Sequence, residues 1–200
     1  MPIRPFSCST LRLASGASAR RYTWSSPVTA SAGFPLRSTT SPATRAWDSF
    51  GVKPFLESTI EDLERFFATN VRGTFLMTQA AVPLMIAGGG GSIINVGTTL
   101  VQQAMTTLPV SAAMASKGGV HALTVSLAAE LAGHGIRVNT QAPGNIRTPL
   151  IDDPDSLAAI HPLQRVGEVA DTTEAALFLA RASFVTGTTL DVDGGYSHGR

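Results

Sequence analysis

The sequence predicts an α/β fold in which helices flank a parallel sheet, and two features of the chain carry that prediction. The first is an alternation of helical stretches with short β-rich runs, in the chain order 58–86 (helix), 92–96 (strand), 111–131 (helix), 136–139 (strand), 168–180 (helix) and 188–192 (strand). The second is the shortness of the connections, which favours parallel strands with helices crossing over the sheet. Ligands of such sheets bind at the carboxyl ends of the strands. The sequence places Thr98, Thr99 and the loop of residues 143–148 at those ends.

The composition limits the classes of protein to which the chain can belong. Its 200 residues, 44% hydrophobic and 14% charged, suffice for one domain or slightly less. Cys8 is the single cysteine, which excludes a disulfide framework, and the spacing of the four histidines indicates no metal site. No apolar run approaches the roughly 20 residues that a spanning helix needs. A net charge of +1 does not indicate the basic surface that nucleic-acid binding requires. We therefore expect a soluble, cytoplasmic protein that binds neither membranes nor nucleic acid.

Residues 1–50 differ from the rest of the chain in charge and pattern. They contain six arginines and one acid, a balance of +5, whereas the remaining 150 residues have a balance of −4. Only Leu11 with Leu13 and residues 34–36 are candidates for short extended pieces. We therefore divide the chain into an irregular or aberrant segment, residues 1–50, and a domain, residues 51–200. Three interpretations of the first segment stay open: an organellar transit peptide, a disordered tail, and, as the favoured hypothesis, a domain start read in the wrong frame.

The first long helix is expected to begin at Ser58. Ser58 and Glu61 have the spacing of a capping box, in which a hydroxyl and a carboxylate satisfy free backbone N–H groups. A broad apolar face follows at helical spacing and runs toward residue 86. Gly73 and Pro83 are expected to interrupt this helix, and the glycines at 88–91 to end it.

The later elements follow from the same signals. The strand at residues 92–96 is bounded by glycines, and the helix from Ser111 is expected to end at Gly133. Pro143 and Gly144 turn the chain into a polar loop. Three aspartates of this loop, Asp152, Asp153 and Asp155, are interpreted as a solvated loop and helix start, with a weak cation site as the alternative.

Six short motifs lie in a fixed order between Asn70 and Gly195. They are Asn70-Val71-Arg72-Gly73; Gly91-Ser92-Ile93-Ile94-Asn95-Val96-Gly97-Thr98; Ala115-Ser116-Lys117; Leu127–Leu131 leading into Ile136–Asn139; Pro143-Gly144 with Thr148; and Thr186-Gly187 before Asp191–Gly195. Together they resemble the short-chain dehydrogenase/reductase family, over the chain from Gly51 to its C-terminus. The resemblance implies a Rossmann-like parallel sheet flanked by helices, of which the first half is missing or irregular here.

The resemblance implies roles for four residues of the catalytic side. Lys117 matches the lysine that holds the nicotinamide ribose hydroxyls and lowers the pKa of a nearby phenol. Asn70 matches the helix residue that, by bending the helix locally, anchors a water in the proton relay. Thr98 or Thr99 takes the place of the serine that polarises the substrate carbonyl, a task that a threonine hydroxyl can also perform.

The resemblance also implies a cofactor, NAD or NADP, which supplies the hydride chemistry. The cofactor-binding positions that it carries over are Lys117, Pro143, Gly144, Ile146 and Thr148. The family's two long helices pack against their counterparts in a partner subunit, so a homodimer or homotetramer is implied. The substrate would be a small carbonyl compound or alcohol whose identity the sequence leaves open.

The chain departs from the family pattern in two places. The family's tyrosine lies four residues before its lysine, and that position is Ala113 here. An alanine cannot exchange a proton, and loss of a general acid lowers rates by about 10²- to 10⁴-fold. The glycine-rich turn that approaches the pyrophosphate is also missing, since residues 15–18 contain one glycine. The choice between NAD and NADP therefore stays open.

Two functions are consistent with these features. The first is an oxidoreductase that transfers hydride between a nicotinamide cofactor and a carbonyl or alcohol substrate. The alternative is a catalytically impaired remnant that acts as a non-enzymatic self-association module. Lys117 and the 143–148 segment favour the first function, whereas Ala113 and the absent glycine-rich turn favour the second.

Overall fold

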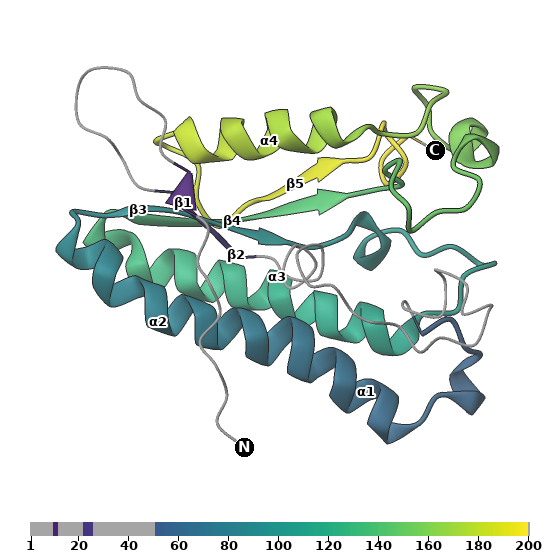
Figure 1. Cartoon of the computed structure of the whole chain (residues 1–200), viewed down its shortest axis with the longest axis horizontal. Helices are drawn as coiled ribbons and strands as arrows, with labels where there is room; N and C mark the ends of the chain where they lie inside the picture. The colour runs from purple at the N-terminus through teal and green to yellow at the C-terminus, as the bar shows by residue number, and fades with distance from the viewer. Residues whose placement is uncertain (1–9, 12–21, 26–50, 200) are drawn as a thin grey trace.

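The computed structural model describes residues 10–11, 22–25 and 51–199 and contains one five-stranded sheet (Figure 1). In spatial order the strands are β1 (Thr10–Leu11), β2 (Tyr22–Ser25), β3 (Gly91–Val96), β4 (Ile136–Pro143) and β5 (Thr189–Val192). Strands β2 to β5 are parallel to one another, and β1 is antiparallel to β2. The predicted parallel α/β sheet is confirmed.

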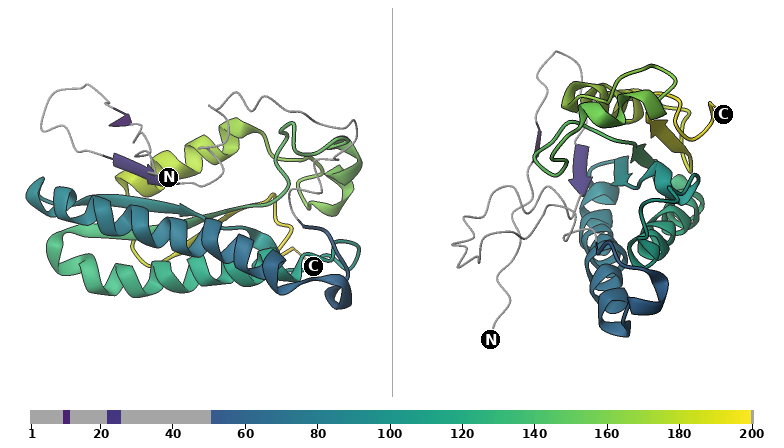
Figure 2. Two further views of the ribbon diagram at one scale, coloured as in Figure 1. Left: turned by 60° about the horizontal axis from the view of Figure 1, so that its bottom comes forward. Right: turned by 90° about the vertical axis from the view of Figure 1, so that its right-hand side faces the viewer.

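Helices cover both faces of this sheet, in three layers. Helices α1 (Ile60–Phe66), α2 (Gly73–Ala87) and α3 (Ser111–Leu131) lie on one face, and α4 (Val169–Arg181) lies on the other (Figures 1 and 2). Short 3-10 turns complete the connections at Phe55–Glu57, Thr99–Val101, Ala132–His134 and Asp155–Ile160.

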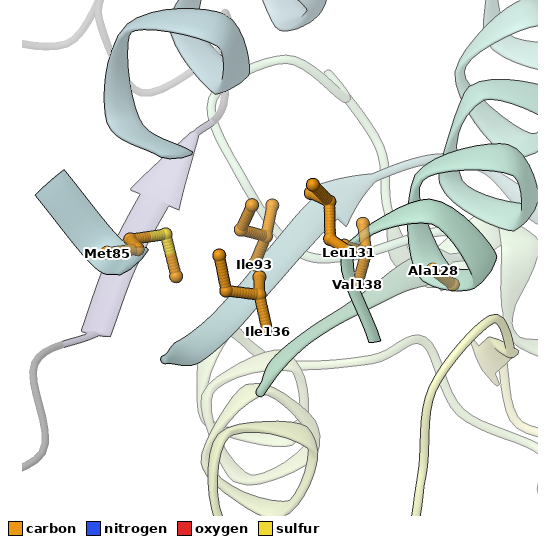
Figure 3. Packing of buried hydrophobic residues seen from close by; sticks show 6 residues of the cluster. All are labelled: Met85, Ile93, Ala128, Leu131, Ile136 and Val138. Atoms are coloured by element: carbon orange, nitrogen blue, oxygen red, sulfur yellow. The ribbon is translucent and has the colours of Figure 1, made fainter. Parts of the chain in front are cut away.

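The core consists of two clusters separated by the sheet. Successive residues of a strand point to opposite faces, so Ile93 joins the cluster under α2 and α3, whereas Ile94 joins the one under α4. The first cluster is the larger and contains Met85, Ile93, Ala128, Leu131, Ile136 and Val138 (Figure 3). The second contains Ile94, Ala176 and Leu179. This double burial explains why residues 92–96 lack polar alternation.

Strand β2 was not predicted, because a four-residue strand has too little pattern to stand out. It pairs with β3 from Tyr22 opposite Ser92 to Ser25 opposite Asn95. Leu11 lies in β1, as an extended piece should. The predictions for Leu13, residues 15–18 and residues 34–36 lie outside the described residues, and the division at residue 50 stays a prediction.

The capping box was predicted one residue too early. Thr59, not Ser58, is the N-cap of α1: its Oγ1 accepts a hydrogen bond from the Asp62 amide at 3.3 Å, and the Asp62 carboxylate accepts one from the Thr59 amide at 3.2 Å. Ser58 instead closes the preceding 3-10 turn, where its amide donates to the Phe55 carbonyl. Ser58 with Glu61 and Thr59 with Asp62 have the same spacing. The 3-10 turn that ends at Ser58 leaves Thr59 as the N-cap.

The long helix is irregular around Asn70, where the family resemblance indicates a local bend. Six residues, Phe67–Arg72, form a π-helical turn between α1 and α2. Gly73 has ordinary helical angles and begins α2, which continues through Pro83 to Ala87. The expected interruptions at Gly73 and Pro83 are therefore wrong. The π turn has no composition signal of its own, since it widens one turn by a residue.

The other elements agree with the prediction apart from the length of β4. This strand continues four residues beyond Asn139, to Pro143. Thr140 and Gln141 are buried polar residues whose side chains contact Thr124 of α3 and the Thr172 carbonyl of α4. Because these residues are polar, the apolar pattern stops before the strand does.

Candidate functional site

The candidate site lies at the carboxyl edge of the sheet, beyond β3 and β4. Thr98 and Thr99 follow β3 after a single glycine, and the 143–148 loop begins where β4 ends. Helix α3 contributes Lys117, and the π turn contributes Asn70. Parallel strands bring their carboxyl ends to one edge, which is why residues distant in the sequence meet here.

Lys117 is joined to the end of β3. Its Nζ donates a hydrogen bond to the Val96 carbonyl at 2.8 Å. Burial lowers its pKa from the ordinary value of 10.5 to about 8, because desolvation disfavours the charged amine. Within the described part of the chain, no carboxylate forms an ion pair with it. An ammonium has three donor hydrogens, so two remain for a ligand.

Asn70 is linked to the same helix by a chain of hydrogen bonds. Its buried amide Nδ2 donates to the Ser116 hydroxyl at 2.8 Å. That hydroxyl in turn donates to the Ala113 carbonyl at 2.7 Å. The π turn is therefore fastened to the segment of α3 that contains Lys117, and π turns of this kind are frequent at functional sites.

Ala113 lies one helical turn before Lys117, on the same side of α3. Its side chain is a buried methyl group. A methyl group offers neither a donor nor an acceptor, so position 113, one turn before Lys117, contributes no proton-transfer group.

The two threonines after β3 differ in exposure. Thr98 is half-buried, and its Oγ1 accepts a hydrogen bond from the Leu100 amide at 3.3 Å. This bond leaves the hydroxyl hydrogen of Thr98 available to a ligand. Thr99 is fully buried, and its Oγ1 has no hydrogen-bond partner among the described residues. The geometry thus favours Thr98 over Thr99 as the ligand-facing hydroxyl.

The 143–148 loop is tightly packed at its beginning and half-exposed further on. The Gly144 amide donates to the Val192 carbonyl at 3.0 Å, and a Cβ at this position would lie 2.7 Å from the Asp193 Cβ. Only glycine fits that close approach. Ile146, which pairs with Gly167, and Thr148 are both half-buried. Both residues are therefore partly accessible beside the carboxyl edge of the sheet.

Charged side chains hold the far end of this loop. Arg147 forms ion pairs with Asp155, an exposed residue that begins a 3-10 turn, and with Glu168, the N-cap of α4. Asp155 lies in the polar loop that the sequence indicated, but its pairing with Arg147 was not foreseen, because eight residues separate the two. No group of three or more metal-ligating side chains occurs in the described residues.

The sequence assigns no catalytic or binding role to two histidines that lie near the site. His121 lies one turn after Lys117 and packs on Gly97, and burial lowers its pKa although Asp191 opposes the shift. His161 is fully buried next to the 143–148 loop. Neither residue has a sequence signal, because each is defined by contacts with distant strands.

No helix among the described residues is both long enough and apolar enough to cross a membrane.

The fold and the site define a class of protein, the Rossmann-like α/β proteins with a ligand site at the carboxyl edge of the sheet. A family model described as "Enoyl-(Acyl carrier protein) reductase" matches residues 43–197. With this match and the relatives reported next, the chain belongs to the short-chain dehydrogenase/reductase family.

Known proteins similar to this chain include enzymes and solved structures. Galactitol 2-dehydrogenase (L-tagatose-forming) of Cereibacter sphaeroides is 41% identical over 154 residues, which are 71% of this chain and 59% of that protein. A short-chain type dehydrogenase/reductase from Mycobacterium marinum is 37% identical with a TM-score of 0.68, covering 74% of this chain and 61% of that one. ElxO with NADP bound is 29% identical with a TM-score of 0.66, covering 72% and 61%. The chain thus spans less than two thirds of these relatives.

Proposed function

We propose that the chain belongs to an oxidoreductase that transfers hydride between NAD or NADP and a small carbonyl or alcohol substrate. The observation that carries the proposal is the Lys117 amine, held on the Val96 carbonyl at the carboxyl edge of the sheet with two donor hydrogens to spare. Several similar proteins are named as dehydrogenases or reductases, and one solved relative has NADP bound, which supports the same reaction class.

The residues of this edge fit the nicotinamide half of such a cofactor. Two donor hydrogens on Lys117 suit a pair of ribose hydroxyls, and the polar groups of the loop up to Thr148 suit a carboxamide. Pro143 and Gly144 bring the backbone to this edge by ending β4 there. When bound, the cofactor supplies the hydride chemistry, and the chain supplies binding and orientation.

The remaining site residues act on the substrate and on the position of Lys117. The Thr98 hydroxyl donates a hydrogen bond to the substrate carbonyl, which polarises it, and Thr99 supports the same turn from inside. Asn70 holds α3 in place through Ser116. Because Ala113 supplies no acid, turnover is slow, by about 10²- to 10⁴-fold relative to a site with a phenol.

The first test is cofactor binding by the purified 200-residue chain. NADH and NADPH are titrated while the fluorescence of the reduced nicotinamide is followed, with Lys117→Ala as the test variant. Lys53→Ala is the matched control, because Lys53 is the other lysine of the chain and is ion-paired with Asp62 at 2.7 Å near α1. We expect saturable binding by the wild type and the control, and a loss of about tenfold or more in affinity for Lys117→Ala.

Two results contradict the proposal. One is the absence of saturable binding in a sample whose circular dichroism shows a folded chain. The other is equal affinity of the wild type and Lys117→Ala, which would place any bound nicotinamide away from this edge. A screen of carbonyl substrates follows only if the variant loses binding.

We also propose a homodimer or homotetramer located in the cytoplasm. Helices α2 and α3 expose large apolar side chains: Leu76 is 54% exposed, Leu84 74% and Val125 59%. Exposed apolar side chains on neighbouring helices are typical of surfaces that bind another protein. A chain with the single cysteine Cys8 has no disulfide within it to require an oxidising compartment.

A further inference from the structure

His161 is a buried titratable residue to which the proposed function assigns no role. It follows the 3-10 turn Asp155–Ile160 and is 1% exposed. Its Nδ1 lies 2.6 Å from the backbone carbonyl oxygen of Asp193, and its Nε2 lies 3.2 Å from the side-chain amide nitrogen Nδ2 of Asn145. The ring therefore spans two segments that are 48 residues apart in the chain.

The partners of the ring determine which nitrogen carries the proton. A backbone carbonyl only accepts hydrogen bonds, so Nδ1 must donate to Asp193. A neutral imidazole has one proton, which leaves Nε2 as the acceptor of the Asn145 amide. His161 is thus held as the Nδ1–H tautomer by two bonds of opposite direction.

The two segments joined by His161 meet at the candidate cofactor site. Asn145 lies within the 143–148 loop, and Asp193 follows β5. The contact is close, since a Cβ at Gly144 would lie 3.6 Å from the His161 Cε1. The next turn is fastened too, because the Leu163 amide donates to the Gly194 carbonyl at 3.1 Å. On its other side the ring packs against Tyr196, with 5.9 Å between ring centroids.

We infer that His161 is a positioning residue, which as the Nδ1–H tautomer holds Asn145 and thereby the 145–148 segment in the conformation that binds the nicotinamide carboxamide. The inference rests on the proposed function and names a residue outside its site. His161 does not touch the cofactor; it acts by accepting the Asn145 hydrogen bond while its other nitrogen is anchored on the end of β5.

Two substitutions separate the two bonds. In His161→Gln, the side-chain oxygen reaches the place of Nε2 and accepts from Asn145, but the bond to Asp193 is lost. In His161→Asn, the shorter amide reaches the place of Nδ1 and donates to Asp193, but the bond to Asn145 is lost. Each variant loses one neutral hydrogen bond, so the two should be similar in stability.

The experiment measures urea stability and the affinities for NADH and NADPH for the wild type and both variants, with His134→Gln, at an exposed histidine, as the control. We expect His161→Gln to bind the reduced cofactor that the wild type prefers within about threefold of the wild type, and His161→Asn to bind it about tenfold more weakly at similar stability. Nitrogen-15 spectra of histidine-labelled wild type, without cofactor, should show an Nδ1–H signal that disappears in both variants.

The outcomes are distinguishable from those of the proposed function. If the wild type binds neither NADH nor NADPH, the proposed function fails and the positioning role falls with it. If the wild type binds but the two variants have equal affinities, or affinities that follow their stabilities, the positioning role alone is contradicted. An Nε2–H signal for His161 contradicts it as well.

Discussion

At the scale of single residues, the site combines a retained amine with a missing acid. Lys117 is held by the Val96 carbonyl and has a pKa lowered by burial, whereas Ala113, one turn earlier, presents a methyl group. The Asn70–Ser116–Ala113 chain of hydrogen bonds keeps the backbone at this position in place. A phenol introduced at residue 113 would therefore stand on the Lys117 side of α3.

Ala113→Tyr should raise turnover by about tenfold or more, because the phenol adds a general acid next to an ammonium that favours its ionised form. The measurement is the steady-state rate of NADH-dependent reduction of a carbonyl substrate found by screening. Ala113→Phe is the matched control, since it adds the ring without the hydroxyl. Equal rates for the two variants would show that the proton takes another route.

Burial of Lys117 should make stability depend on pH in a defined window. Its pKa is about 8 in the folded chain against an ordinary value of 10.5, so between these values the unfolded chain binds more protons. The free energy of unfolding therefore rises with pH between about pH 8 and pH 10.5. Below pH 8, burial of the charged amine lowers the free energy of unfolding by about 3 kcal/mol. Lys117→Met, which has no charge, should be more stable than the wild type by about this amount at pH 7, with the difference shrinking toward pH 10.

Urea unfolding of both proteins at pH 7, 8.5 and 10 measures this difference. Lys53→Met reports the effect of removing a lysine charge outside the site, at an amine that is ion-paired with Asp62. A difference between Lys117→Met and the wild type that stays constant with pH would mean that the amine titrates alike in the folded and unfolded chains.

At the scale of elements, the sequence predicted the long, strongly patterned pieces and missed those set by their neighbours. Helix α3 and strand β3 follow from apolar pattern and flanking glycines. The start of α1 was misplaced because Ser58 and Thr59 have equally good capping partners, and the 3-10 turn before them decides. The π turn has no signal in the apolar pattern, and only the family resemblance of Asn70 indicated a bend there; its partner Ser116 is 46 residues away in the sequence.

The exposed apolar sides of α2 and α3 should mediate self-association. Leu76→Glu combined with Val125→Glu places two charges on these helices and should convert an oligomer into a monomer of about 20.8 kDa. Size-exclusion chromatography with light scattering gives the mass, and Leu163→Glu, at a loop residue that is 66% exposed, controls for the added charge. A monomeric wild type would contradict the proposed oligomer.

At the scale of the whole molecule, the parallel sheet explains both what the sequence revealed of the site and what it hid. Thr98 and the 143–148 loop were predictable as neighbours, because parallel strands end at one edge, whereas Lys117 of α3 was assigned to the site by the family resemblance. The geometry adds a distinction between Thr98 and Thr99 that their identical side chains conceal. His161 was not predictable, because its two partners lie 16 and 32 residues away on separate segments.

The π turn at Phe67–Arg72 inserts one extra residue into the first long helix. Each residue of an ordinary helix advances the rotation by about 100°. Deleting one residue of the turn would restore a regular α-helix, but it would also rotate α1 relative to α2 by about that angle. Either Asn70 would swing away from Ser116, or Met85 would leave the cluster under the sheet. The extra residue lets Asn70, between α1 and α2, contact Ser116 while Met85, near the end of α2, remains in the apolar core.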